Sequence, residues 1–318
     1  MRDNPVMTDT RPDTQAANGA FSSLAPEERA RMLALGPVWA RDIAGHRDQV
    51  LKAYLPILAA TPREGLSVTR DLAYGSHPRQ CLDIYSRTGL KNAPVAVFIH
   101  GGAFVRGEKD SNVEVYANVL RYFSRHGIVG VNVEFRLAPE AVYPGGAEDV
   151  GRAVAWVRAN VAAHGGDPQR IVLIGHSAGG SHAGAYACDP AVVPREGHGL
   201  AGLVLISSRL RADVLPGNPN AGAVRVYYGA DESLYEERSV TTHAARLDIP
   251  VFLAAAEFEN PYLDAYTAEF AARVGMARGK MPRLMHLRGH NHASIVAHFD
   301  SGEEVLGREL VEFVRDPR

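Results

Sequence analysis

The chain is poor in cysteine, in lysine and in net charge. Its 318 residues include two cysteines, Cys81 and Cys188, which lie far apart and outside any CxxC or Cys/His spacing. Neither a disulfide framework nor a zinc site is therefore indicated. The formal net charge is −2, and only four of the 34 basic residues are lysine. This balance argues against nucleic acid as a partner, because binding a phosphate backbone requires a concentrated positive surface.

Long apolar runs are missing as well. No segment reaches the about 18 apolar residues that a membrane span requires, so we expect no membrane insertion. The first residues are polar and carry Asp3, Asp9 and Asp13, whereas a signal peptide has a basic start and an apolar run. We therefore expect a cytoplasmic protein in which residues 1–20 are disordered.

The remaining composition is that of an ordinary globular protein, with 46% hydrophobic and 22% charged residues. One α/β domain with a small appendage is the leading interpretation at this length. Apolar residues recur at roughly helical spacing within residues 21–62, which predicts short helices before a main domain at residues 63–318. Residues 209–247 are rich in proline and glycine, and we interpret them as an excursion that forms part of a lid.

The main domain begins with a predicted hairpin, since residues 66–74 and 80–85 alternate and are rich in β-formers. Strands then alternate with helices, which is typical of a mostly parallel sheet covered on both faces. Residues 95–99 form a continuous apolar run, as expected of a strand buried on both sides. The predicted order beyond it is helix 113–126, strand 128–133, helix 147–164, strand 171–174, a helix from 178, strands 203–207 and 251–256, a helix from 262, strand 284–287 and a C-terminal helix.

The sequence Gly175-His176-Ser177-Ala178-Gly179 matches the motif Gly-x-Ser-x-Gly and stands between a predicted strand and a predicted helix. In this context the motif places a nucleophilic serine on a tight strand-to-helix turn, with the helix N-terminus facing any negative charge that forms there. The alternative is a glycine-rich turn that matches by chance. The strand and helix on either side favour the nucleophile.

A second loop, His100-Gly101-Gly102-Ala103-Phe104, follows the strand at residues 95–99. Here an α/β hydrolase needs backbone N–H groups that stabilise the oxyanion of a tetrahedral intermediate. An ordinary strand-terminating turn is the alternative for this loop taken alone.

Together these loops resemble the hormone-sensitive-lipase-like carboxylesterases of the α/β-hydrolase superfamily. The third matching segment is Glu134-Phe135-Arg136-Leu137-Ala138-Pro139-Glu140. The resemblance implies the α/β-hydrolase fold, with a mostly parallel eight-stranded sheet, flanking helices and a helical cap formed by residues 21–62. It also implies that Gly102, Ala103 and Ala178 donate their backbone N–H groups to the oxyanion, while Gly101 shapes the turn. The loop reads Gly-Gly-Ala where many members have three glycines, which also resembles feruloyl-esterase-like and kynurenine-formamidase-like relatives and leaves ester or amide preference open.

Chain order in this fold places the catalytic acid after a late strand and the histidine after the last strand. Glu257 and Glu259 both follow the strand at residues 251–256, and similarity to the family favours Glu259 as the acid. His292 is favoured as the base by the same resemblance, with His290 as the alternative. Four histidines, His286, His290, His292 and His298, also allow a metal cluster, but no carboxylate joins them at ligand spacing.

The predicted function is hydrolysis of carboxylic esters with short or medium acyl groups, through an acyl-enzyme on Ser177. No cofactor and no metal are expected. An amidase or formamidase with the same triad is the alternative within enzymes, and a binding protein on an inactive hydrolase scaffold is the alternative outside them. Phe104 and Phe258 are candidates for lining the substrate pocket. The expected partner is a small-molecule ester, with no nucleic acid and no membrane, and a homodimer is also considered.

Overall fold

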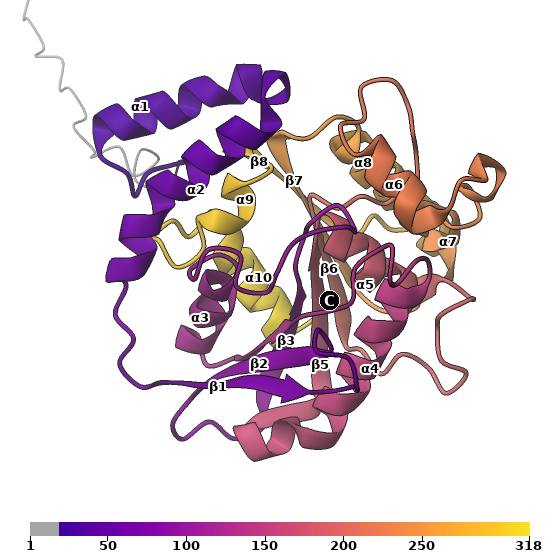
Figure 1. Cartoon of the computed structure of the whole chain (residues 1–318). Coiled ribbons are helices and arrows are strands. Elements are labelled where there is room, and N and C mark those ends of the chain that lie inside the picture. The colour runs from indigo at the N-terminus through magenta and orange to yellow at the C-terminus, as the bar shows by residue number, and fades with distance from the viewer. Residues whose placement is uncertain (1–18) are drawn as a thin grey trace, which may run out of the picture.

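An eight-stranded sheet runs through the centre of the molecule in the computed structural model, which describes residues 19–318 (Figure 1). Its strands are β1 (Leu66–Ala73), β2 (Cys81–Arg87), β3 (Ala93–Ile99), β4 (Val129–Val133), β5 (Gly166–His176), β6 (Gly202–Ile206), β7 (Val251–Phe258) and β8 (Arg283–Asn291). They lie in the order β1-β2-β4-β3-β5-β6-β7-β8. β2 pairs antiparallel with both β1 and β4, and every other pairing is parallel. The predicted mostly parallel sheet with an antiparallel edge is confirmed.

Helices cover both faces of this sheet. The α-helices are α1 (Pro26–Leu35), α2 (Ile43–Ala60), α3 (Ala117–Arg125), α4 (Gly145–Asn160), α5 (Ala178–Cys188), α6 (Ala221–Tyr228), α7 (Val240–His243), α8 (Leu263–Arg278), α9 (Ser294–Ala297) and α10 (Val305–Arg315). Short 3-10 helices are η2 (Gly36–Arg41), η3 (Val161–His164), η4 (Glu232–Leu234) and η5 (Ala244–Arg246). No helix within residues 19–318 is long and apolar enough to cross a membrane.

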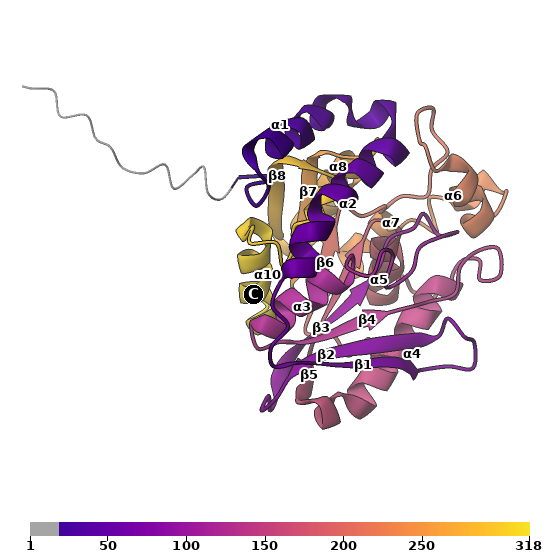
Figure 2. The ribbon, with the colours of Figure 1, turned by 60° about the vertical axis from the view of Figure 1, so that its left-hand side comes forward.

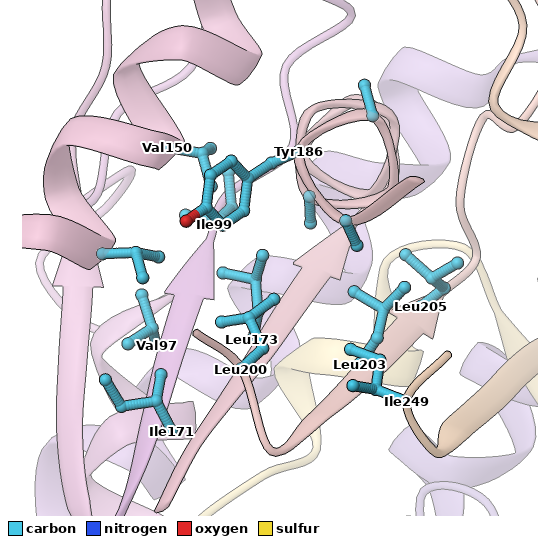
Figure 3. Close-up of a cluster of buried hydrophobic side chains, with 14 of the residues drawn as sticks. Val97, Ile99, Val150, Ile171, Leu173, Tyr186, Leu200, Leu203, Leu205 and Ile249 are labelled. Carbon is cyan, nitrogen blue, oxygen red and sulfur yellow. The ribbon is translucent and has the colours of Figure 1, made fainter. Parts of the chain in front are cut away.

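Alternate residues of the central strands supply the two cores. Val97 of β3 and Leu173 of β5 point to the face covered by α4, α5 and α8, as the close-up in Figure 3 shows for the first two helices. The next residues along, Phe98 and Ile174, point to the opposite face, where α3 and α10 pack. A strand buried on both sides must be apolar at every position, which explains the continuous apolar runs. This arrangement fixes the carboxyl ends of β3, β5, β7 and β8 beside one another.

One predicted helix starts later in the structure, and one short helix was not predicted. The third α-helix begins at Ala117 instead of Val113, because the Asn112 side chain accepts hydrogen bonds from the N–H groups of Glu114 (3.3 Å) and Val115 (2.8 Å) and holds a turn there. The four-residue helix α9 was not predicted, since four residues carry no helical periodicity.

The N-terminal helices α1 and α2 lie together beside the sheet end at β7 and β8, as Figure 2 shows. η2 contacts both strands and α2 contacts α9. Phe21, Trp39 and Tyr54 of this segment form a third core with Ala293 and Ala297. The disorder predicted for residues 1–20 lies outside the described residues, apart from Gly19 and the buried Ala20.

Residues 209–247 contain α6, η4, α7 and η5. α7 contacts α5 and η5 contacts α8, and Leu210 and Val240 belong to the main core. Most of the surface excursion therefore lies between Ala212 and Arg238, where α6 is seen at the periphery of the molecule in Figure 1.

Candidate active site

Ser177 occupies a sharp turn between β5 and α5. Its backbone torsions, φ 55° and ψ −121°, are ones that surrounding contacts must enforce in a residue with a side chain. The Ser177 N–H donates to the carbonyl of Ile206 at the end of β6 (3.1 Å), and its carbonyl accepts from the N–H of Arg209 (3.0 Å). These bonds hold the Ser177 hydroxyl at the carboxyl edge of the sheet, beside the first turn of α5.

The glycines of the motif allow the turn to pack. A Cβ at Gly179 would lie 2.2 Å from the carbonyl oxygen of Ile99, and a Cβ at Gly175 would lie 2.6 Å from the carbonyl oxygen of Gly179. Both separations are far below van der Waals contact distance, and the atoms involved belong to the backbone, which cannot move without distorting the strands. The two glycines are thus required for α5 to start directly against β3 and β5.

Ser177, His292 and Glu259 lie in one hydrogen-bonded line. The Ser177 hydroxyl lies 3.0 Å from His292 Nε2, and His292 Nδ1 lies 2.7 Å from Glu259 Oε2. A carboxylate can only accept, so Nδ1 carries the proton and Nε2 is free to accept from the serine. This is the geometry that a serine nucleophile, its general base and an orienting acid require.

Glu259 is held firmly in this position. Its other oxygen, Oε1, accepts from the N–H of Ala256 (2.9 Å) and from the Ser207 hydroxyl. The Glu259 side chain is 3% exposed and that of His292 is 12% exposed. The His292 N–H is also tied to the Phe258 carbonyl (3.1 Å), so the acid and base loops are joined through their backbones.

The alternative acid and base lie elsewhere. Glu257 is exposed, and its carboxylate accepts from the N–H of Gly289 on β8 (2.6 Å). His290 is buried, with Nδ1 3.1 Å from the Ser294 hydroxyl, and burial holds its pKa well below the usual value. Neither side chain meets Ser177.

The loop after β3 borders Ser177. A Cβ at Gly101 would lie 3.1 Å from the Ser177 Cβ, and a Cβ at Gly102, whose φ is 150°, would lie 1.8 Å from the carbonyl oxygen of Arg106. Ala103 adopts the left-handed region at φ 50°. Ala178 is the first residue of α5, where backbone N–H groups have no helical acceptor. Gly102 and Ala103 line the same cavity as Ser177, and Ala178 follows the serine directly, so the three N–H groups are candidates for an oxyanion site.

His176 and Tyr116 are part of the site although no sequence signal predicted them. The His176 ring packs against the His292 ring with centroids 4.9 Å apart, and its Nε2 lies 3.2 Å from the His292 carbonyl. Its Nδ1 lies 3.3 Å from the Tyr116 hydroxyl. Burial, followed by the neighbouring His292, lowers the His176 pKa well below its usual value, so the ring stays neutral. His176 fills the variable position of Gly-x-Ser-x-Gly, and only the fold brings it to His292.

A cavity of about 860 Å³ opens above Ser177. It is lined by Trp39, Leu51 and other residues of η2 and α2, by the loop after β3, and by Pro219 and Asn220. Trp39 also donates its indole N–H to Asn260 Oδ1 (2.9 Å), which links η2 to the residue beside Glu259. η2 and α2 thus form part of the pocket wall.

The two predicted pocket aromatics lie outside this wall. Phe104 is 1% exposed and stacks on Tyr227, with centroids 4.6 Å apart, in an aromatic cluster behind the loop. Phe258 packs against η2, where a Cβ at Gly36 would lie 2.3 Å from its ring. Phe104 and Phe258 thus support loops instead of facing the cavity.

Comparison with known proteins gives partial sequence matches and near-complete structural ones. Residues 82–190 match the BD-FAE family. The esterase LipC of Mycobacterium tuberculosis is 38% identical over 140 residues, which cover 42% of this chain and 34% of that protein, so the chain matches about a third of this relative's length. The carboxylesterase NlhH of Mycobacterium tuberculosis is 43% identical over 90 residues, covering 28% of this chain and 27% of NlhH.

Among solved structures, an esterase from the archaeon Pyrobaculum calidifontis superposes with a TM-score of 0.68 at 22% identity and covers 92% of this chain and 98% of that one. A bacterial heroin esterase has a TM-score of 0.66 at 26% identity and covers 94% and 99%. Within residues 19–318 no group of three or more His, Cys, Asp or Glu side chains is arranged to hold a metal ion. The sheet, the serine turn and these similarities show that the chain has the α/β-hydrolase fold and resembles carboxylesterases over part of its sequence.

Proposed function

We propose that the chain is a serine hydrolase of carboxylic esters. The observation that carries this proposal is the line of hydrogen bonds from Ser177 through His292 to Glu259. His292 takes the serine proton as the hydroxyl attacks the ester carbonyl, and Glu259 holds the ring and stabilises the imidazolium that forms. His292 then returns the proton to the leaving alcohol, and water cleaves the acyl-enzyme by the same route.

The N–H groups of Gly102, Ala103 and Ala178 are proposed to bind the oxyanion, with Gly101 shaping the turn. They lie on rigid elements, since the loop follows β3 and Ala178 begins α5. Fixed donors are effective because they need no reorganisation when charge develops, and losing one such donor typically lowers kcat by about 10²–10³. The proposed mechanism needs no cofactor and no metal.

Short or medium acyl groups are the proposed substrates. The cavity of about 860 Å³ lies within the range of sites for small molecules, and α2 covers it in the manner of a cap. Residues 21–62 are proposed as that cap, and Pro219 and Asn220 extend residues 209–247 to the cavity as a second covering segment. A walled cavity limits the acyl length that can lie beside Ser177.

A panel of 4-nitrophenyl esters from acetate to palmitate tests this function, with anilides and N-formylkynurenine measured beside it. We expect kcat/KM to rise and then fall along the ester series. Ser177→Ala should lower kcat by about 10³ or more, and a fluorophosphonate should label Ser177 in the unaltered protein but not in the variant. Faster turnover of the anilides or of N-formylkynurenine would instead identify an amidase, and a Ser177→Ala protein of full activity would refute the nucleophile.

A cytoplasmic location is proposed as well, and the two free cysteines, Cys81 and Cys188, are consistent with a reducing compartment. A homodimer is a hypothesis that sedimentation of the purified chain would decide.

A further inference from the structure

The cavity above Ser177 carries more positive than negative charge. Its cationic lining residues are Arg41, Arg47, Lys52 and Arg106, and its carboxylates are Asp42 and Asp48. Four cations thus face two anions. A neutral ester gains little from such a wall, because charged groups lose hydration when a ligand covers them and need a partner in return. The excess of positive charge in the lining therefore favours a negatively charged ligand.

Both carboxylates already have partners. Asp42 accepts from the N–H of Gly45 (3.0 Å) as the N-cap of α2, where negative charge complements the helix N-terminus. Asp48 pairs with the neighbouring Arg47 through one oxygen, Oδ1, at 2.8 Å and is 67% exposed, so solvent weakens this ion pair. Neither carboxylate contacts Arg106.

Arg106 has a neutral partner. Its Nη2 donates to the Asn220 side-chain oxygen at 3.2 Å, and among residues 19–318 no carboxylate forms an ion pair with it. Burial, followed by the charge of Arg47, holds the pKa of Arg106 below its ordinary value. Both guanidiniums border the same cavity and carry like charge, so an anion placed between them would relieve their repulsion.

The two arginines come from different elements that both line the cavity. Arg47 lies on α2, and Arg106 lies on the loop that supplies the proposed oxyanion donors, with its N–H bonded to the Gly102 carbonyl at 3.1 Å. The charge of Arg47 also acts on Tyr116, whose hydroxyl lies 3.3 Å from His176 in the site. An anion held by both side chains would thus lie in the same cavity as Ser177.

We propose that the substrate is an ester that also bears a carboxylate, held between Arg47 and Arg106 while its ester carbonyl lies at Ser177. This inference rests on the proposed hydrolase function and adds the chemical class of the substrate. Guanidinium suits this ligand because its planar pair of N–H groups matches the two oxygens of a carboxylate. Binding would also draw α2 and the loop after β3 together over the ester.

Two matched pairs of substrates separate charge from size. 4-Acetoxybenzoate and its methyl ester place the carboxylate on the leaving group, and mono-4-nitrophenyl glutarate and 4-nitrophenyl pentanoate place it on the acyl group. We expect the carboxylated member of at least one pair to have a kcat/KM about tenfold higher, with the difference in KM. Added salt should reduce this preference, because partly exposed charges are screened.

The variants Arg47→Gln and Arg106→Gln test the two residues through the ratio of kcat/KM within the preferred pair. We expect each substitution to lower that ratio about tenfold. Arg195→Gln is the matched control, since Arg195 is exposed and lies outside the cavity lining, and its ratio should equal that of the unaltered protein.

The outcomes test the carboxylate preference separately from the proposed ester hydrolysis. Turnover of the neutral esters without preference for the carboxylated ones, or a preference that survives both arginine substitutions, overturns the inference alone. Absence of turnover with every ester overturns the proposed function. Calorimetric titration of Ser177→Ala with 4-acetoxybenzoate and with its methyl ester measures binding in either case, and equal affinities would again refute the anion site.

Discussion

The ring of His176 packs against that of His292 at an interplanar angle of 34°, and its Nε2–H donates to the His292 carbonyl. A group that can only accept, such as this carbonyl, fixes the His176 tautomer, so Nδ1 accepts from the Tyr116 hydroxyl. His176 thus contacts both the ring and the backbone of the proposed base.

Replacing His176 with Phe should leave the ring packing and remove both hydrogen bonds. We expect kcat for a 4-nitrophenyl ester to fall about tenfold with KM nearly unchanged, because the His292 ring loses part of what orients it. His164→Phe is the control, since His164 ends η3 far from the cavity lining. Equal kcat values for the two variants would remove His176 from a positioning role.

Glu257, near the end of β7, and Glu259, directly after it, should respond very differently to replacement by glutamine. Glu259→Gln removes the charge that faces His292 and is expected to lower kcat by about 10³, as the acid of a triad does when it can no longer stabilise the imidazolium. Glu257→Gln alters an exposed side chain bonded to the Gly289 N–H and should leave kcat within about twofold. Steady-state kinetics of both variants decides the acid, and the reverse pattern would assign it to Glu257.

Adding one methyl group at Gly179 should damage the serine turn. The new Cβ would overlap the Ile99 carbonyl oxygen, so we expect Gly179→Ala to reduce the free energy of unfolding by about 1–3 kcal/mol or more. Gly222→Ala in α6 is the matched control, because a Cβ there meets no atom within 4 Å. Urea denaturation of both variants measures the difference, and equal stabilities would contradict the packing described for the turn.

Stability should fall as pH decreases from 6.5 toward 5. Burial lowers the pKa of His182 to about 3 and holds the pKa values of His176 and His290 well below the ordinary 6.5. Below pH 6.5 the unfolded chain therefore binds protons that the folded chain does not, and each such histidine removes up to about 1.4 kcal/mol per pH unit. The carboxylates with lowered pKa values, such as Glu134, lose their contribution only at lower pH.

Urea denaturation at pH 7, 6 and 5 measures this slope. His182→Asn should reduce it by up to about 1.4 kcal/mol per pH unit, since one buried neutral ring is removed. A free energy of unfolding that is constant from pH 7 to 5 would contradict the buried neutral state of these rings.

The sequence predicts the α/β-hydrolase fold because buried parallel strands are apolar at every position and the serine motif needs a strand before it and a helix after it. The residues alone do not decide whether Glu257 or Glu259 is the acid, because both follow the same predicted strand and are two residues apart. The structure separates them where the pairing of β7 with β8 shifts after Ala256, so that Glu257 reaches β8 and Glu259 turns back to the N–H of Ala256.

The contacts of His176 and the cationic cavity wall depend on segments that are distant in sequence. Tyr116 and His176 are 60 residues apart, and Arg106 and Asn220 are 114 apart. Local sequence patterns carry no information on contacts between residues so far apart in the chain. The prediction that Phe104 faces the pocket illustrates the same limit, because an aromatic residue next to an active-site loop can equally pack behind it.

The hydrogen bond from Trp39 to Asn260 would couple the proposed cap to the proposed catalytic acid. Asn260 adjoins Glu259, so lifting η2 away would free the loop that aims this carboxylate at His292. Admission of substrate and alignment of the base are then mechanically connected. With the cap open, Glu259 would be misplaced and catalysis would be slow while water and unrelated esters have the freest access. This coupling would limit reaction with unselected molecules.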